Sequence, residues 1–284
     1  MVFLVTLCAS HINEAKRLSS LKSAVKSHSN QTLSTPLFIS ISFEDAFEKL
    51  VDDLIESLTT ISIKFFKQKG RLSQFQHYKY LAEQFDTIFT NRMWCLFMDD
   101  DDYLNCKRNS LFASLLPSVN KRNETSLLIM PVMMTSWDGD IDQKQLEKWL
   151  KMGINSTTVV PTTEYVCYSV QLSLLKRFCE FLARHKKIGY NQCDVAFAYL
   201  LSNICQTYVD RCEWLYAYNR TNTHLRITHM EKVDRYIAEF DEALFDDMAT
   251  EFKFTHISDM LKGQTSVYGA STYRAAFEAR KSAT

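Results

Sequence analysis

The first half of the chain alternates short apolar runs with longer segments of helical hydrophobic spacing. The apolar runs predict strands over residues 2–7, 37–42, 61–65 and 94–98. Between them, apolar residues spaced by three and four positions predict helices over residues 15–30, 43–58 and 73–89. Strands that alternate with helices are typical of a parallel sheet covered by helices.

The order of elements changes after residue 102. The pattern predicts strands over residues 126–135 and 156–160, and helices over residues 143–152, 172–185, 195–209 and 231–247. With six glycines and four prolines, the chain contains no flexible linker that would separate domains. We therefore predict an α/β fold in which a mostly parallel, Rossmann-like sheet forms one domain over residues 1–227. A helical C-terminal extension over residues 228–284 would pack on it.

The composition is that of a globular chain long enough to bury a full core, with 284 residues of which 46% are apolar. Lys plus Arg and Asp plus Glu both number 33, so the formal net charge is zero. This balance gives no electrostatic reason to expect nucleic acid as a partner. No apolar stretch reaches the roughly 18 residues of a transmembrane helix, and the apolar N-terminal run lacks the basic region of a signal peptide.

The eight cysteines show none of the spacings of a zinc site, and most lie within apolar runs. Such cysteines are typical of reduced, buried side chains, although their even number leaves a disulfide framework open. Without a convincing secretory signal we expect a soluble, cytoplasmic protein in a reducing compartment.

An acidic run, Asp99-Asp100-Asp101-Asp102, directly follows the predicted strand at 94–98. Four adjacent carboxylates repel one another unless a cation neutralises them. Hard oxygen ligands of this kind suit Mn²⁺ or Mg²⁺. A solvated acidic turn, or a cluster capping a helix over residues 103–116, is the alternative. Placement at the carboxyl end of a sheet strand favours the metal, because open α/β sheets bind ligands there.

The sequence Phe97-Met98 followed by four Asp resembles the DxD signature of glycosyltransferases with the GT-A fold, especially the large inverting family that includes chitin and rhamnan synthase domains. The resemblance covers residues 2–224. It implies that Asp99 contacts the nucleoside ribose and can share the metal, that Asp101 ligates the metal, and that Asp102 lies near the sugar. Because all four positions are Asp, a shift of one residue stays open, and Asp100 is a further nucleotide-side candidate.

The N-terminal part carries the resemblance further, since Ser10-His11-Ile12-Asn13-Glu14 is similar to the Tyr-Asn-Glu turn that follows strand one in the family, although the common Pro-Thr-Tyr wording is absent. On that match the base pocket would be lined by Thr6, Cys8 and Ser10, with Glu14 on the uracil or ribose side. A first-turn helix acid is the alternative for Glu14.

Two further segments match positions that contact the base or phosphates in the family. Ser42 ends the second predicted strand and is placed like a second base contact. A polar segment after the third strand contains Lys69, Gly70, Arg71 and Gln74. A solvated basic loop is an equal alternative for that segment.

The resemblance also implies functional residues in the second half. Asp194 would be the catalytic base, although Cys193 stands where the family has Glu, and helix capping is the alternative. A later His, with His224 favoured over His229, would supply a further metal ligand or diphosphate contact, and an ordinary surface His is the alternative for each. Trp137 and Asp138 would bind the acceptor, with a surface turn as the alternative, and Arg220 would balance phosphate charge.

Other protein classes fit the residues less well. A phosphatase that uses the first Asp of DxD as nucleophile expects Thr or Val where Tyr103 stands. A sugar nucleotidyltransferase needs a Gly-rich loop near the start, and residues 7–13 contain no Gly. A binding protein that kept the fold and lost turnover stays open. The sequence thus predicts a metal-dependent, inverting transferase from a nucleotide-sugar donor, expected to be UDP-linked, to a glycan or glycoprotein, with a retaining outcome left open.

Overall fold

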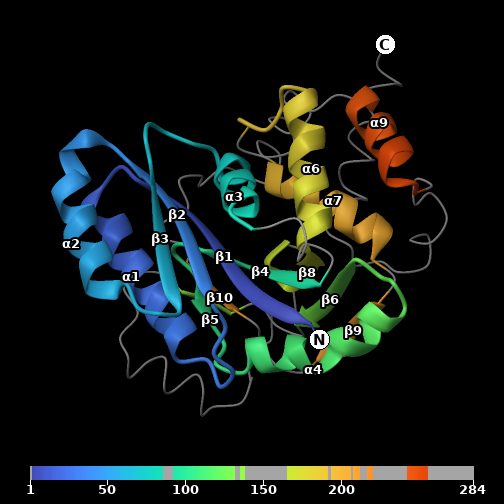
Figure 1. Ribbon diagram of the computed structural model, residues 1–284, viewed down its shortest axis with the longest axis horizontal. Helices are drawn as coiled ribbons and strands as arrows, with labels where there is room; N and C mark the ends of the chain where they lie inside the picture. The colour runs from blue at the N-terminus through green and yellow to red at the C-terminus, as the bar shows by residue number, and fades with distance from the viewer. Residues whose placement is uncertain are drawn as a thin grey trace.

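A seven-stranded sheet, in which only β8 runs against the other strands, forms the centre of the protein in the computed structural model (Figure 1). The structure describes residues 2–85, 92–131, 135–137, 165–190, 193–205, 207–211, 216–219 and 242–254. The strand order is β3-β2-β1-β4-β8-β6-β9. The strands are β1 (Phe3–Ile12), β2 (Leu37–Phe43), β3 (Ile63–Gln68), β4 (Met93–Asp99), β6 (Ser126–Pro131), β8 (Tyr168–Gln171) and β9 (Thr207–Arg211).

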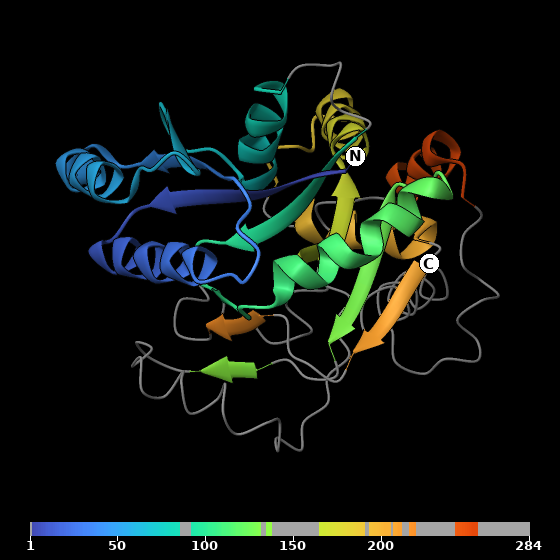
Figure 2. The same cartoon turned by 60° about the horizontal axis from the view of Figure 1, so that its bottom comes forward.

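Helices cover both faces of this sheet. Figure 2 shows α1 (Ala15–Ser29) and α4 (Arg108–Lys121) on one face, and α3 (Gln74–Glu83) and α6 (Leu172–Arg184) on the other. The helix α2 (Glu48–Leu58), preceded by the short 3-10 helix η1 (Asp45–Phe47), lies beside α1. The helix α7 (Cys193–Ile204) packs against α3, and α9 (Glu242–Phe252) packs against α6 through Phe252. The predicted α/β class, with a mostly parallel sheet flanked by helices, is therefore confirmed.

The central strands are apolar on both faces because helices cover both. Leu7 and Cys8 of β1, and Leu96 and Phe97 of β4, have no solvent-exposed surface. Continuous apolar runs of this kind are typical of buried parallel strands. On the α3 face the core is aromatic, with Phe75, Phe97, Phe178 and Phe197 in edge-on or tilted ring contact.

The chain changes direction across the sheet at β1. The units β1-α1-β2 and β2-α2-β3 extend the sheet toward one edge, and α3 then carries the chain back to β4 on the other side of β1. The strand order therefore reverses at the carboxyl ends of β1 and β4, and open α/β sheets bind ligands in the crevice at such a point. Ala9 and Asp99 are in register there.

A second, three-stranded sheet follows the acidic run. It contains β5 (Tyr103–Leu104), β10 (Tyr216–Asn219) and β7 (Thr135–Trp137), in the order β5-β10-β7. The backbone N–H of Leu104 donates to Ser27 Oγ of α1 at 3.0 Å, which ties β5 to that helix. The alternative of a helix over residues 103–116 that begins directly after the acidic run is therefore wrong, since α4 begins only at Arg108.

Several predicted boundaries change in the structure. β1 continues to Ile12 through the expected turn at Ser10. The predicted strand at 126–135 is divided between β6 and β7, which lie in different sheets, and the predicted helix at 195–209 ends at Ile204, before β9. The predicted elements at 143–152 and 156–160, and the boundary at 227/228, lie outside the described residues.

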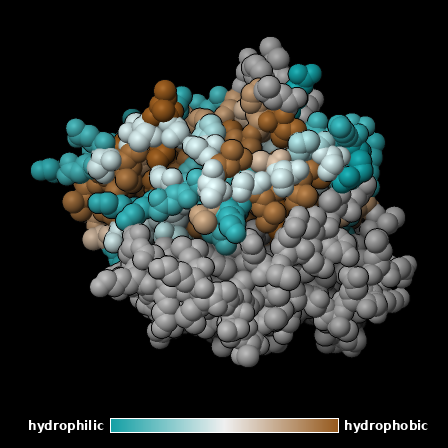
Figure 3. All heavy atoms as spheres, turned by 90° about the horizontal axis from the view of Figure 1, so that it is seen from below, coloured by the Kyte–Doolittle hydropathy of each residue, from teal (hydrophilic) through white to brown (hydrophobic). Residues whose placement is uncertain are grey.

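The described surface mixes apolar and polar side chains. In Figure 3 the described part of the face in view carries several brown groups separated by teal and white residues. Among the helices of the described residues, none is long and apolar enough to cross a membrane.

Candidate functional site

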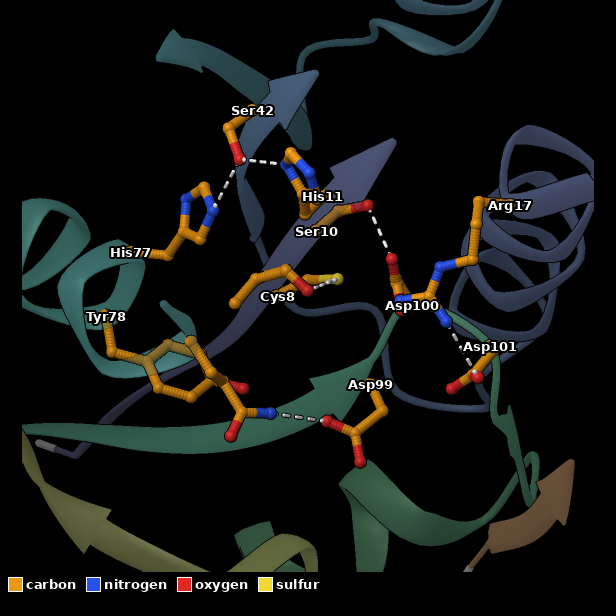
Figure 4. Close-up of polar contacts among 12 residues, drawn as sticks. Cys8, Ser10, His11, Arg17, Ser42, His77, Tyr78, Asp99, Asp100 and Asp101 are labelled. Atoms are coloured by element: carbon orange, nitrogen blue, oxygen red, sulfur yellow. Dashed lines mark hydrogen bonds and ion pairs between the residues drawn. The ribbon is translucent and has the colours of Figure 1, made fainter. Parts of the chain in front are cut away.

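The acidic run lies at the crevice between β1 and β4 because Asp99 is the last residue of β4 and the turn follows at once. Side chains of a strand alternate between its two faces. Asp99 therefore points to the α3 face and Asp100 to the α1 face, as Figure 4 shows. The run is divided between two separate sets of partners.

On the α3 face, Asp99 is bound by two neutral donors. Gln74 Nε2 donates to Asp99 Oδ1 at 3.0 Å, and the Tyr165 hydroxyl donates to the same oxygen. Gln74 Nε2 also donates to the Tyr165 oxygen at 2.7 Å. Burial raises the pKa of Asp99 well above its usual value, the Tyr165 bond opposes this, and the charges of Asp101, Asp100 and Asp194 raise it further.

On the α1 face, Asp100 and Asp101 are bound by a cation and a hydroxyl. Ser10 Oγ donates to Asp100 Oδ2 at 2.6 Å. Arg17 Nη2 donates to Asp100 Oδ1 at 2.7 Å, and its Nη1 donates to Asp101 Oδ2 at 3.1 Å. Burial raises the pKa of Asp101 to about 7, helped by the charge of Asp100 and opposed by Arg17.

These residues fit a divalent cation by the chemistry of their donor atoms. Asp99 and Asp101 offer hard carboxylate oxygens, and burial together with the neighbouring carboxylates raises the pKa of both groups, a cost that a bound cation would reduce. Within the described residues, no group of three His, Cys, Asp or Glu side chains is arranged to hold a metal ion. Asp99 and Asp101 would therefore hold a cation together with oxygen atoms of a second molecule bound in the site.

A second polar chain lies at the carboxyl ends of β1 and β2 (Figure 4). His11 Nδ1 and His77 Nε2 lie 2.9 and 3.1 Å from Ser42 Oγ, and His77 Nδ1 lies 2.8 Å from Ser40 Oγ. Burial lowers the pKa of His77 to about 4 and also lowers that of His11, to which the nearby charge of Arg71 contributes. Both imidazoles are therefore neutral at pH 7.

The structure brings only part of the predicted base pocket to the crevice. Ser10 and Ser42 lie at the strand ends, but both hydroxyls are bound by protein partners. Thr6 is fully buried, and its hydroxyl lies 3.2 Å from both His28 Nε2 and Thr35 Oγ1, beneath α1 and away from the strand ends. Cys8 is fully buried below the acidic run, whose charges add to the effect of burial in raising its pKa.

Among the candidates at the start of α3 and the acid before α1, only Gln74 contacts the acidic run directly. Gln74 contacts Asp99, while Arg71 lies in an exposed loop beside His11. Gly70 in that loop has φ +73°, so its glycine serves the turn. Glu14 is exposed at the N-cap of α1, with no side-chain capping bond, and its charge acts on Arg17.

The candidates from the second half are only partly described. Asp194 lies in the first turn of α7, near enough for its charge to affect Asp99, and Asp102 is buried next to β5. Trp137 ends β7, in register with Asn219 of β10. The remaining candidates lie outside the described residues: Asp138, Arg220, His224 and His229.

Two residues that bind the acidic run, Arg17 and Tyr165, were not predicted from the sequence. Arg17 lies in the first turn of the helix that follows strand one, and helices of α/β sheets begin at the carboxyl edge. Its position was therefore a usable signal. Tyr165 lies 66 residues from Asp99 in sequence and has no local pattern that points to it.

Comparisons with known proteins give limited similarity. No protein-family profile matches the chain, and no curated protein sequence does. Among solved structures, S. aureus TarS matches with a TM-score of 0.46 and 14% identity over 89% of this chain and 43% of the TarS chain. The structure of S. aureus TarS 1–349 with UDP gives 0.46, and the one without UDP gives 0.43, each at 13% identity over 92% of this chain and 73% of theirs. This chain thus spans less than half of the longer TarS chain, and identities of this size do not identify a shared activity.

Proposed function

We propose that this protein is a metal-dependent glycosyltransferase that moves a sugar from a nucleoside diphosphate, with uridine diphosphate as the expected carrier, to a hydroxyl of a glycan or glycoprotein. The position of the acidic run carries the proposal. Asp99 ends β4 and Asp100 to Asp102 follow it, at the point where the strand order reverses, which is where α/β sheets bind nucleotides. The resemblance of the run to the DxD signature of glycosyltransferases implies that the nucleotide is a nucleotide-sugar donor.

The residues of the run have different roles in this proposal. Asp99 and Asp101 would hold Mn²⁺ or Mg²⁺, which when bound offsets the charge of the departing diphosphate. Asp102 would face the sugar. Asp100 has both oxygens bound by Ser10 and Arg17 and so would hold the turn rather than contact the nucleotide.

Asp194 would be the base in an inverting transfer. The acceptor hydroxyl oxygen would bond to the anomeric carbon, the bond from that carbon to the diphosphate would break, and the hydroxyl proton would pass to Asp194. The position of Asp194 in the first turn of α7, from which its charge acts on Asp99, supports this role.

The cysteines support an intracellular site of action as part of the same proposal. Seven of them lie in the described residues, and no two of these seven are joined by a disulfide. Free, mostly buried cysteines are typical of proteins from reducing compartments such as the cytoplasm.

Ligand binding tests the nucleotide and the metal together. We expect UDP with Mn²⁺ to raise the melting temperature of the protein, since a ligand that binds only the folded state stabilises it. Asp101→Ala should abolish the part of the shift that depends on Mn²⁺. Asp53→Ala, which removes an exposed carboxylate of α2, is the matched control and should keep it. An equal shift in both variants would exclude Asp101 as a ligand of the metal.

Turnover separates a transferase from a protein that only binds the nucleotide. A panel of UDP-sugars with Mn²⁺ should include one from which the protein releases UDP, by hydrolysis or by transfer. Asp194→Asn should remove that release and retain the UDP-dependent thermal shift. Binding of UDP without release from any donor would favour the binding protein over the enzyme.

A further inference from the structure

Arg17 is a charged residue of the site that the proposed function leaves without a role. It comes from the first turn of α1 and binds two neighbouring carboxylates of the acidic run, Asp100 and Asp101. The three side chains are 13%, 5% and 15% exposed. Charge pairs shielded from water in this way interact more strongly than pairs at the surface.

The two carboxylates are held to different extents. Asp100 receives hydrogen bonds on both oxygens, from Ser10 on Oδ2 and from Arg17 on Oδ1. Asp101 receives the Arg17 bond only on Oδ2, and this bond is the longer of the two by 3.1 against 2.7 Å. Asp101 is therefore the carboxylate that Arg17 can release with less loss.

Arg17 itself is incompletely bound. Its Nε is buried and donates to no described residue, so only its two terminal nitrogens are bound to acceptors. A buried donor without an acceptor is unfavourable, so the present arrangement does not use all the hydrogen bonds that the guanidinium can make.

We propose that Arg17 is an internal counter-ion that competes with the divalent cation for Asp101, while it keeps Asp100 fixed. This inference rests on the proposed function, because it assumes that the cation binds Asp101. Without metal, Arg17 neutralises part of the charge of the run. When the cation binds, Arg17 gives up Asp101 Oδ2 and retains Asp100, so the affinity for metal is set by the exchange of one cation for another.

Direct metal binding tests the competition. Mn²⁺ is titrated into the full chain at pH 8, without nucleotide, and free Mn²⁺ is measured by electron paramagnetic resonance. Arg17→Met keeps the aliphatic stem and removes the charge, so we expect the Kd for Mn²⁺ to fall by about tenfold or more. Lys16→Met is the matched control: it removes one positive charge from the adjacent, exposed position of α1 and should leave the Kd within about twofold.

A second variant covers the case in which Arg17→Met fails to fold. Arg17→Lys keeps the charge but presents one ammonium, which cannot bind both carboxylates as the planar guanidinium does. We expect the Kd of Arg17→Lys for Mn²⁺ to fall by about threefold relative to the wild type, which is less than for Arg17→Met. Cooperative thermal unfolding of each variant shows that it is folded.

The outcomes separate this inference from the proposed function. If Arg17 only positioned Asp101 for the metal, both variants would bind Mn²⁺ more weakly than Lys16→Met, and unchanged or weaker binding overturns the competition. Binding of Mn²⁺ by the wild type that survives in Asp101→Ala would instead refute the metal site of the proposed function. Binding by Arg17→Met that is absent in the wild type would support the competition in its strongest form.

Discussion

Two buried tyrosines three residues apart provide a matched test of the contacts on the α3 face. The Tyr165 hydroxyl donates to Asp99 and accepts from Gln74. The Tyr168 hydroxyl, equally buried, has no hydrogen-bond partner among the described residues. Replacing each by Phe removes one oxygen from the interior and leaves the ring packing in place.

The two substitutions are expected to change the free energy of unfolding differently. A hydrogen bond contributes about 1 kcal/mol between neutral groups and up to about 3 kcal/mol where the acceptor is charged, and its loss leaves a buried acceptor less satisfied. We therefore expect Tyr165→Phe to decrease the free energy of unfolding by about 1 to 3 kcal/mol. Tyr168→Phe removes a buried hydroxyl that has no partner to lose, so its free energy of unfolding should stay within about 0.5 kcal/mol or increase.

Urea unfolding at pH 7.5, followed by circular dichroism, measures both variants against the wild type. At an m value of about 3 kcal/mol per molar, a loss of 1.5 kcal/mol lowers the midpoint by about 0.5 M. A Tyr168→Phe variant that loses as much stability as Tyr165→Phe would refute the reasoning, since the loss would then come from ring packing or the backbone and not from Asp99.

Two further predictions concern α3, which carries Gln74. Folding lowers the pKa of His77 from 6.5 to about 4 through burial, so the unfolded chain binds more protons between these values and stability decreases as the pH falls below about 6.5. His77→Gln should remove this dependence. Between pH 7.5 and pH 5 the free energy of unfolding of the wild type, measured with urea, should therefore fall by about 2 kcal/mol more than that of His77→Gln. A difference in stability between the two proteins that is the same at both pH values would contradict this prediction. Ser73 caps α3 in a capping box with Gln76, so Ser73→Ala should decrease the free energy of unfolding by about 1 kcal/mol by the same assay, and an unchanged midpoint would show that the cap is dispensable.

The alternating pattern was sufficient to predict strands β1 to β4 of the sheet, and the acidic run marked the carboxyl end of β4. Both depend on local sequence, because strand period and chain order determine which ends of the strands meet. β8 was missed because its four residues are all buried and continue directly into α6, so they show no alternation. The contact of Tyr165 with Asp99 was missed because it joins distant segments.

The sequence also did not indicate the counter-ion of the acidic run. A metal was expected to neutralise the adjacent carboxylates, and the structure adds Arg17, which pairs with two of them. Sequence patterns give the spacing of charges within a segment and not the direction of a side chain from another helix. Thr6 shows the same limit, because its partner His28 lies at the far end of α1.

The division of the acidic run between two faces has a consequence for how the end of β4 tolerates change. β4 ends within a run of four Asp residues, so a slip of the strand by one position still directs one carboxylate toward the helices on each face of the sheet. The same slip between β1 and β4 would, however, turn the buried apolar residues of β4 to the opposite face. In the structure the hydrogen-bond partners show which carboxylate serves each side: Tyr165 and Gln74 bind Asp99, and Arg17 with Ser10 binds Asp100.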